Sequence, residues 1–132
     1  MAQTKITHDN IAASFSLPNA NLNNDVFNND RSWTGSQRST MVTDNDGNFD
    51  LNGGQNFKCT PSGNITLTFS NHVSGQSGFV ILVNSGGHTI SLETYTKADA
   101  NLATTVTTAG TYIISYIDDG TCAYLTNSAV MA

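Results

Sequence analysis

The sequence predicts an all-β domain, a small antiparallel β-sandwich or barrel-like fold that follows an extended N-terminal arm. Asparagine, threonine and serine supply 47 of the 132 residues, whereas the helix-favouring glutamate, lysine and arginine together supply only six. Short stretches of alternating apolar and polar residues are separated by turn-forming residues, which is typical of strands in a sandwich or barrel. A chain of this length holds a single domain.

The first 37 residues differ in composition from the rest, so we expect the arm at 1–37 and the β-sandwich domain at 38–132. Between Asn19 and Asp30, six asparagines and two aspartates leave no apolar period of 2 or 3.6, so no regular element is expected there. The arm has too many large apolar side chains for a free tail, and it is expected to dock on a partner or to pack on its own domain. Its candidate partner-binding residues are Ile6, Ile11, Phe15, Leu17, Phe27 and Trp33.

Eight strands joined by tight turns are expected after the arm. They span residues 38–43, 48–52, 56–60, 64–70, 79–84, 88–92, 112–118 and 121–127. The eight strands are expected to form four hairpins, each made of two consecutive strands. The turns of the four hairpins are Asp44-Asn45-Asp46-Gly47, Pro61-Ser62-Gly63, Ser85-Gly86-Gly87 and Asp118-Asp119-Gly120. The threonine-rich segment 93–109 is expected to be a loop, although residues 97–103 are compatible with one helical turn.

The alternation is complete in residues 65–70, where Ile65, Leu67 and Phe69 are expected to face the core. The apolar run from Phe79 to Val83 is expected to be a buried strand, because a membrane span needs about twenty residues. The expected core consists of Phe57, Ile65, Leu67, Phe69, Val80, Leu82, Ile90 and Ile114.

The strand at 112–118 is apolar on both faces. One face presents Tyr112, Ile114 and Tyr116, and the other presents Ile113 and Ile117. One small core cannot cover both faces, so we expect a subunit interface, most simply in a homotrimer. The candidate interface residues are Tyr112, Ile114, Tyr116 and Tyr124.

The charge balance argues against nucleic acid as a ligand. Five basic and ten acidic residues give a net charge of −5, whereas binding to phosphates requires a positive surface. The N-terminus has no apolar stretch typical of a secretory signal, and no membrane partner is expected. Two cysteines are too few for a disulfide framework; whether Cys59 and Cys122 pair stays open, and buried thiols are the simpler interpretation in a reducing cytosol.

A calcium site is the nearest candidate for metal chemistry. Asp44, Asp46 and Asn48 have the spacing of the first ligands of an EF-hand loop. Phe49 stands where that loop requires glycine, and Gln55 stands where it requires a bidentate glutamate. The three histidines, His8, His72 and His88, are too far apart in the sequence to match the spacing of a zinc site. No metal or cofactor is therefore expected.

Catalytic patterns are also missing from the sequence. Gly75-Gln76-Ser77-Gly78 lacks the spacing of a nucleophile elbow. Paired acids such as Asp118 and Asp119 lie at an expected turn, where nothing buries one carboxyl group and raises its pKa. We therefore expect no enzyme activity and assign no catalytic residue.

Four stretches of the domain carry a recognisable pattern. They are Asn56-Phe57, Ile65-Thr66-Leu67-Thr68-Phe69, the run from Gly75 to Val83, and Thr111-Tyr112-Ile113-Ile114-Ser115-Tyr116. Over about residues 48–128, this pattern resembles a β-domain that recurs in virion proteins of tailed bacteriophages. The segment from Ile6 to Ile11 is similar to the short Ile-Thr-x-x-Asn-Ile segments of phage fibres.

The resemblance implies a virion building block. A single domain with an arm has no shaft to reach a host, so the chain is more similar to a capsid decoration (cement) protein, which binds the lattice of the major capsid protein and stabilises the head, often as a trimer. The implied location is the capsid surface, after synthesis in the cytoplasm of the host bacterium. A tail-fibre or host-adhesion module is the alternative, and an unrelated small enzyme or lectin is the third hypothesis.

Overall fold

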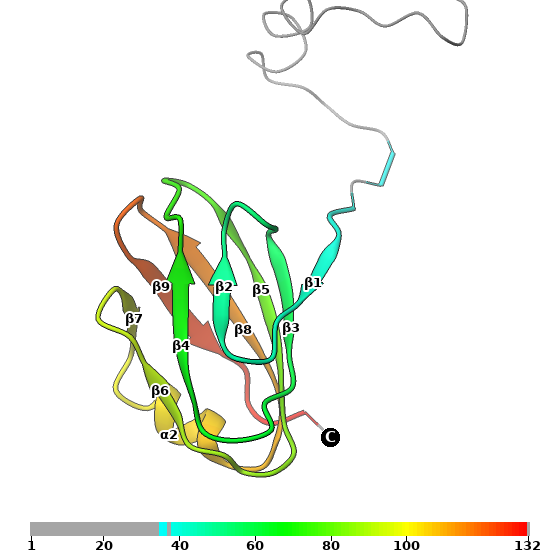
Figure 1. Cartoon of the computed structure of the whole chain (residues 1–132), viewed down its shortest axis with the longest axis vertical. Helices are drawn as coiled ribbons and strands as arrows, with labels where there is room; N and C mark the ends of the chain where they lie inside the picture. Colours follow the sequence, from blue (N-terminus) through cyan, green and yellow to red (C-terminus); the bar gives the residue numbers. More distant parts are fainter. Residues whose placement is uncertain (1–34, 37, 132) are drawn as a thin grey trace, which may run out of the picture. The chain divides into compact units, whose positions relative to one another are not determined.

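The computed structural model describes residues 35–36 and 38–131. Residues from Arg38 onward form a compact unit whose described regular elements are strands apart from one short helix, which confirms the all-β prediction (Figure 1). The six arm residues predicted to bind a partner lie outside the described residues; they are Ile6, Ile11, Phe15, Leu17, Phe27 and Trp33.

The described strands form two sheets that face each other (Figure 1). One has six strands in the order β1-β3-β5-β8-β9-β7, and the other has three in the order β2-β4-β6. The elements are β1 (Met41–Thr43), β2 (Asn48–Asp50), β3 (Asn56–Cys59), β4 (Ile65–Ser70), β5 (Ser77–Asn84), β6 (Ile90–Leu92), β7 (Thr96–Ala98), α2 (Leu102–Thr107), β8 (Gly110–Asp118) and β9 (Ala123–Asn127).

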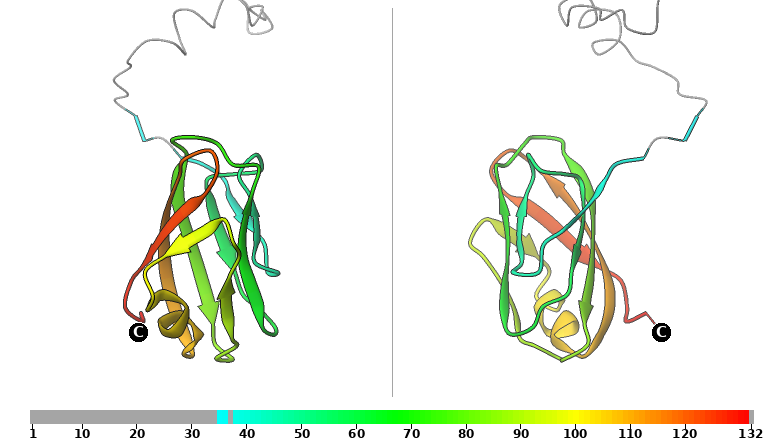
Figure 2. Two further views of the ribbon diagram at one scale, coloured as in Figure 1. Left: turned by 90° about the vertical axis from the view of Figure 1, so that its left-hand side faces the viewer. Right: turned by 45° about the vertical axis from the view of Figure 1, so that its right-hand side comes forward.

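From β1 to β6 the chain crosses to the opposite sheet at every turn, as the two views in Figure 2 show. Strands β1, β3 and β5 therefore pair in parallel, as do β2, β4 and β6, and the chain winds as a short β-solenoid. The antiparallel prediction holds for the β5–β8 and β8–β9 pairs. It is wrong for the parallel pairs among β1 to β6 and for the parallel β7–β9 pair. The hairpins predicted at Asp44–Gly47, Pro61–Gly63 and Ser85–Gly87 are wrong too, because each turn joins strands of different sheets.

Local hydrogen bonds explain why the first turn forms, but they do not determine which strands its two flanking strands pair with. The carboxylate of Asp44 accepts the N–H of Asp46 at 3.1 Å, and that of Asp46 accepts the N–H of Asn48 at 2.9 Å. Gly47 has a φ of +88°, and a Cβ there would lie 2.8 Å from the carbonyl oxygen of Thr66 in the adjoining strand. The two aspartate hydrogen bonds explain why the chain turns here, but they do not determine which sheet receives the next strand.

The hairpin predicted around Asp118-Asp119-Gly120 is confirmed, because β8 and β9 pair antiparallel. Gly120 has a φ of +92°, and its N–H donates to the carboxylate of Asp118 at 2.8 Å. The carboxylate of Asp119 accepts the N–H groups of Thr121 and Cys122 at 2.8 and 2.7 Å. This turn satisfies its own backbone donors, so the local sequence suffices to form it.

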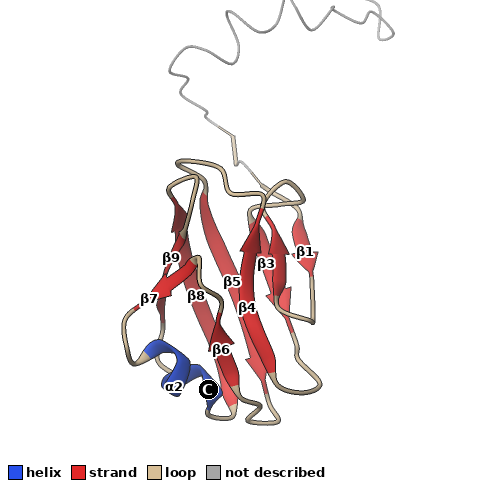
Figure 3. Cartoon of the chain, turned by 60° about the vertical axis from the view of Figure 1, so that its left-hand side comes forward, coloured by secondary structure: helices blue, strands red, loops and turns tan. Residues whose placement is uncertain are grey.

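The segment expected to be a loop, 93–109, contains β7 and α2 instead. Strand β7 pairs in parallel with β9, and α2 contacts β5, β6 and β9 at one end of the two sheets (Figure 3). Leu102 and Val106 lie one helical turn apart and are fully buried. Burial of these two side chains outweighs the weak helix propensity of the surrounding threonines.

The predicted core is largely confirmed. Phe57, Leu67, Phe69, Val80, Leu82, Ile90 and Ile114 are buried, whereas Ile65 is half-buried against the core. Aromatic rings join the two sheets, since Phe49 lies 5.1 Å from Phe57 and Phe69 lies 4.9 Å from Tyr116 between ring centroids. The core thus lies between the sheets and fixes the direction of every second side chain in each strand.

Substitution of Leu67 tests this core. The side chain is fully buried in the middle of the three-stranded sheet. Leu67→Ala should lower the free energy of unfolding by about 3 kcal/mol through lost burial and the cavity left behind. Urea denaturation followed by circular dichroism would measure the change. A loss below about 0.5 kcal/mol would mean that the site is not in the core.

Candidate functional site

The residues predicted to form a subunit interface are mostly inside the chain. Tyr112, Ile114 and Tyr116 belong to the core, so the interface prediction is wrong for these three residues. Both tyrosines can be buried because their hydroxyls find backbone acceptors: Tyr112 donates to the carbonyl of Thr108 at 2.9 Å, and Tyr116 to that of Gln55 at 2.8 Å. Tyr124, the fourth predicted residue, is exposed.

The opposite side of the six-stranded sheet is the apolar surface that remains open. Because strand side chains alternate, burial of the β8 tyrosines turns Ile113 and Ile117 outward. We define the outer face by nine outward-facing residues of this sheet: Met41, Asn56, Lys58, Phe79, Ile81, Ile113, Ile117, Tyr124 and Lys97. Phe79 is 54% exposed and Ile117 is 55% exposed, which is unusual for such large apolar side chains on one sheet.

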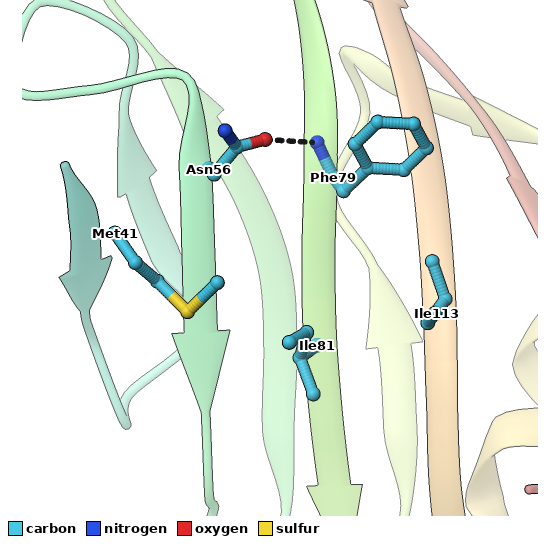
Figure 4. A pocket seen from close by; sticks show the side chains of 5 residues that line it. All are labelled: Met41, Asn56, Phe79, Ile81 and Ile113. Carbon is cyan, nitrogen blue, oxygen red and sulfur yellow. Dashed lines mark hydrogen bonds between the residues drawn. The ribbon is translucent and has the colours of Figure 1, made fainter. Parts of the chain in front are cut away.

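A hollow of about 380 Å³ lies on this face, lined by Met41, Asn56, Phe79, Ile81 and Ile113. Figure 4 shows that the side chains come from neighbouring strands and surround a common space. The amide of Asn56 is already occupied, because its oxygen accepts the N–H of Phe79 at 3.2 Å and its nitrogen donates to the hydroxyl of Ser39. The hollow therefore suits an apolar group better than a polar ligand.

The far end of the outer face combines apolar and acidic character. Ile117 and Tyr124 are register partners in β8 and β9. The hydroxyl of Tyr124 donates to the carboxylate of Asp119 at 3.0 Å. Hydrogen bonds from the N–H groups of Cys122 and Thr121 lower the pKa of Asp119, so this carboxyl group is charged at neutral pH. The face thus has an acidic group at this end and Lys58 beside Ile81 at the hollow.

A histidine–aspartate pair, in which the aspartate is buried and the histidine is half-buried, lies apart from the outer face. Asp118 is 1% exposed, and its carboxylate lies 2.6 Å from Nδ1 of His72. The main chain of Asp118 also binds the 71–76 loop, through Gly75 and Gln76. Within residues 38–131, no serine, threonine or cysteine side chain hydrogen-bonds to His72. The pair therefore braces two loops, a role that neither residue's sequence context revealed.

The thiols give a direct test of burial. Both cysteines are free; Cys59 is buried and Cys122 is half-buried. Burial, with a smaller contribution from the carboxylates of Asp44 and Asp46, raises the pKa of Cys59 to about 11. A thiol-reactive dye at pH 8 should therefore label one thiol per folded chain and two after denaturation. Cys122→Ser should abolish labelling of the folded protein, and rapid labelling of that variant would contradict the burial of Cys59.

Other kinds of site find little support in the described part of the chain. Among residues 35–36 and 38–131, no three histidine, cysteine, aspartate or glutamate side chains are grouped closely enough to hold a metal ion. Of the helices in that same range, none is both long enough and apolar enough to span a membrane. Comparisons with protein-family models, with curated proteins and with solved structures found no match.

Proposed function

We propose that the protein is a structural component of a tailed-bacteriophage virion, namely a capsid decoration (cement) protein that binds the lattice of the major capsid protein and stabilises the head. The exposed apolar outer face is the observation that carries this proposal. A sheet face with Phe79 and Ile117 half exposed favours association with protein over turnover of a small molecule. The resemblance of residues 48–128 to a phage β-domain supplies the viral context.

In this proposal the arm, residues 1–37, attaches the domain to the capsid. Fully extended, it reaches at most about 120 Å, which is enough to cross a boundary between capsid subunits. Burial of any one of its large apolar side chains contributes about 1.5 to 3 kcal/mol before the cost of ordering the chain. The two facing sheets serve as a sandwich-like body that stays folded without the arm.

Deletion of residues 1–37 tests this role. The truncated chain should keep the circular dichroism spectrum of a β-domain but fail to bind undecorated capsids that the full-length protein saturates. Because the chain is acidic and the arm has no basic cluster, binding should change little between low and high salt. Equal binding by the truncated chain would remove the arm from the mechanism, and release by moderate salt would show that ion pairs hold the protein.

The copy number in purified particles separates this proposal from the tail-fibre alternative. A decoration protein should be present in hundreds of copies, comparable with the major capsid protein. Quantitative mass spectrometry of virions would measure that ratio, with a known tail protein of the same particle as the reference. A few copies per particle would contradict the capsid position and favour a tail-fibre or host-adhesion module.

A further inference from the structure

We propose that the outer face of the six-stranded sheet pairs with the same face of a second copy of this chain, in a two-fold symmetric dimer. The inference rests on the proposed structural role, because it names the partner that covers the apolar surface from which that role is argued. It keeps Tyr124 of the predicted interface and replaces Tyr112, Ile114 and Tyr116 with the opposite side of the same strand, β8.

The apolar groups of the outer face form two neighbouring areas. One area is the hollow beside Phe79 and Ile81. The other consists of Ile117 and Tyr124, which are 55% and 47% exposed and are register partners in β8 and β9. A two-fold axis between the two areas places Ile117 and Tyr124 of each copy over the hollow of the other copy. Each copy then supplies both parts of the contact, as a self-complementary interface requires.

The two areas also carry opposite charges, so the pairing that fills the hollow brings a positive group of one copy near a negative group of the other. Lys58 is exposed beside Ile81, and within residues 38–131 no carboxylate lies within 4.0 Å of its ammonium group. Asp119 is exposed at the tip of the β8–β9 turn, next to Tyr124. The axis that fills the hollow brings Lys58 of each copy toward Asp119 of the other. Lys97, on the edge strand β7, already donates to the carbonyl of Thr94.

The size of the face is sufficient for a dimer of modest affinity. With strands about 4.8 Å apart and a rise of about 3.3 Å per residue, the six-stranded sheet has a footprint of roughly 500 Å². Two copies therefore bury about 1,000 Å² in total, which is the lower limit for specific interfaces. We expect a dissociation constant on the order of micromolar, so that mass rises with concentration over an accessible range.

Light scattering and sedimentation velocity on the full-length protein test the pairing. The mass should approach twice 14.0 kDa as concentration rises. Phe79→Ser should raise the dissociation constant at least tenfold without unfolding the domain, because the side chain is 54% exposed. Val73→Ser is the matched control, since Val73 is an exposed apolar residue in the loop before β5, and it should leave the dimer intact.

A double-mutant cycle tests the contact between Lys58 and Asp119. Lys58→Met and Asp119→Asn should each weaken the dimer about fivefold, and the double variant should be no weaker than either single variant. Asparagine keeps an oxygen for the N–H groups of Thr121 and Cys122, so the turn survives. Lys97→Met is the control for loss of a lysine from this face and should leave the dimer unchanged. Independent, additive effects of the two substitutions would overturn the contact.

Three results would overturn the dimer: a monomer at every concentration, a mass unaffected by Phe79→Ser, or a trimer. Capsid binding is measured separately, so the two proposals fail separately. A monomeric protein that decorates capsids would refute only the dimer. A dimer sensitive to Phe79→Ser that binds no capsid would refute only the proposed function.

Discussion

Gly78→Ala is expected to lower the free energy of unfolding by about 4 kcal/mol or more, enough to unfold a marginally stable domain. A Cβ at this position would lie 1.8 Å from the carbonyl oxygen of Gln55 and 2.9 Å from the hydroxyl of Tyr116. The first contact is with backbone, so relief requires β5 to move away from the chain leading into β3. That movement would also strain the hydrogen bond between Tyr116 and Gln55.

Gly63→Ala is the matched control. No atom lies within 4 Å of the position where its Cβ would be built, and its φ is not positive. The same chemical change should therefore alter stability by less than about 1 kcal/mol, with stabilisation possible through a less flexible unfolded chain. Urea unfolding of both variants measures the difference. Similar stability of the two variants would refute the close approach at Gly78.

The Gly75-Gln76-Ser77-Gly78 motif acquires a structural explanation from these contacts. Gly75 has a φ of +85°, which turns the chain into β5. The side-chain amide of Gln76 donates to the carbonyls of Leu51 and Gly54, both at 2.9 Å. Gly78 then admits the carbonyl of Gln55. The motif thus has a structural role, because it holds the segment between β2 and β3 in place.

Asn84→Ala should cost about 4 kcal/mol, the second large effect. Asn84 is completely buried, and its amide nitrogen donates to the carbonyls of His88 and Val106 at 2.8 and 2.9 Å. Its oxygen accepts the N–H of His88 at 2.8 Å. Alanine would leave these backbone groups without their partner in the interior, where unsatisfied polar groups are costly. The link between the end of β5 and α2 would be lost with them.

Asn101→Ala provides the comparison for this variant. Asn101 is exposed at the start of α2, and its side chain makes no capping hydrogen bond. Its replacement should change the free energy of unfolding by less than about 0.5 kcal/mol. Asn84→Asp, which keeps an acceptor for His88 but loses the amide donors, should also be strongly destabilised. Guanidinium denaturation checks all three variants, and a mild Asn84→Ala phenotype would mean that water replaces the amide.

The sequence predicted side-chain direction well and strand partners poorly. Alternation placed Leu67 and Phe69 in the core because a strand side chain has only two directions available. The turn at Asp44–Gly47 was also predicted, since aspartate oxygens satisfy its N–H groups locally. The partner of each strand is decided by contacts far along the chain, such as Asn45 accepting the N–H of Thr60 at 2.8 Å. No local pattern carries that information.

Three of the four predicted interface residues, Tyr112, Ile114 and Tyr116, lie on the buried face of β8, and its other face is open. In β8 both faces are apolar, so composition could not rank them. Tyr116 faces inward because its hydroxyl reaches the carbonyl of Gln55, a partner 61 positions away in the sequence. Ile117 has no polar atom to satisfy in its side chain and faces outward. Asn84 was missed for a related reason, because its backbone partners become neighbours only in the folded chain.

The alternation of consecutive strands between sheets also affects the order of folding. In the described domain, β8 and β9 are the only neighbouring strands that are also consecutive in the chain. Every other pairing must first close a longer loop, so we expect folding in milliseconds to seconds and not in microseconds. During synthesis from the N-terminus, β5 can pair with β3 at once, but its pairing with β8, in which Ser77 faces Ile117, has to wait until β8 is made. The six-stranded sheet is therefore completed only after β9, its last strand in chain order, has left the ribosome.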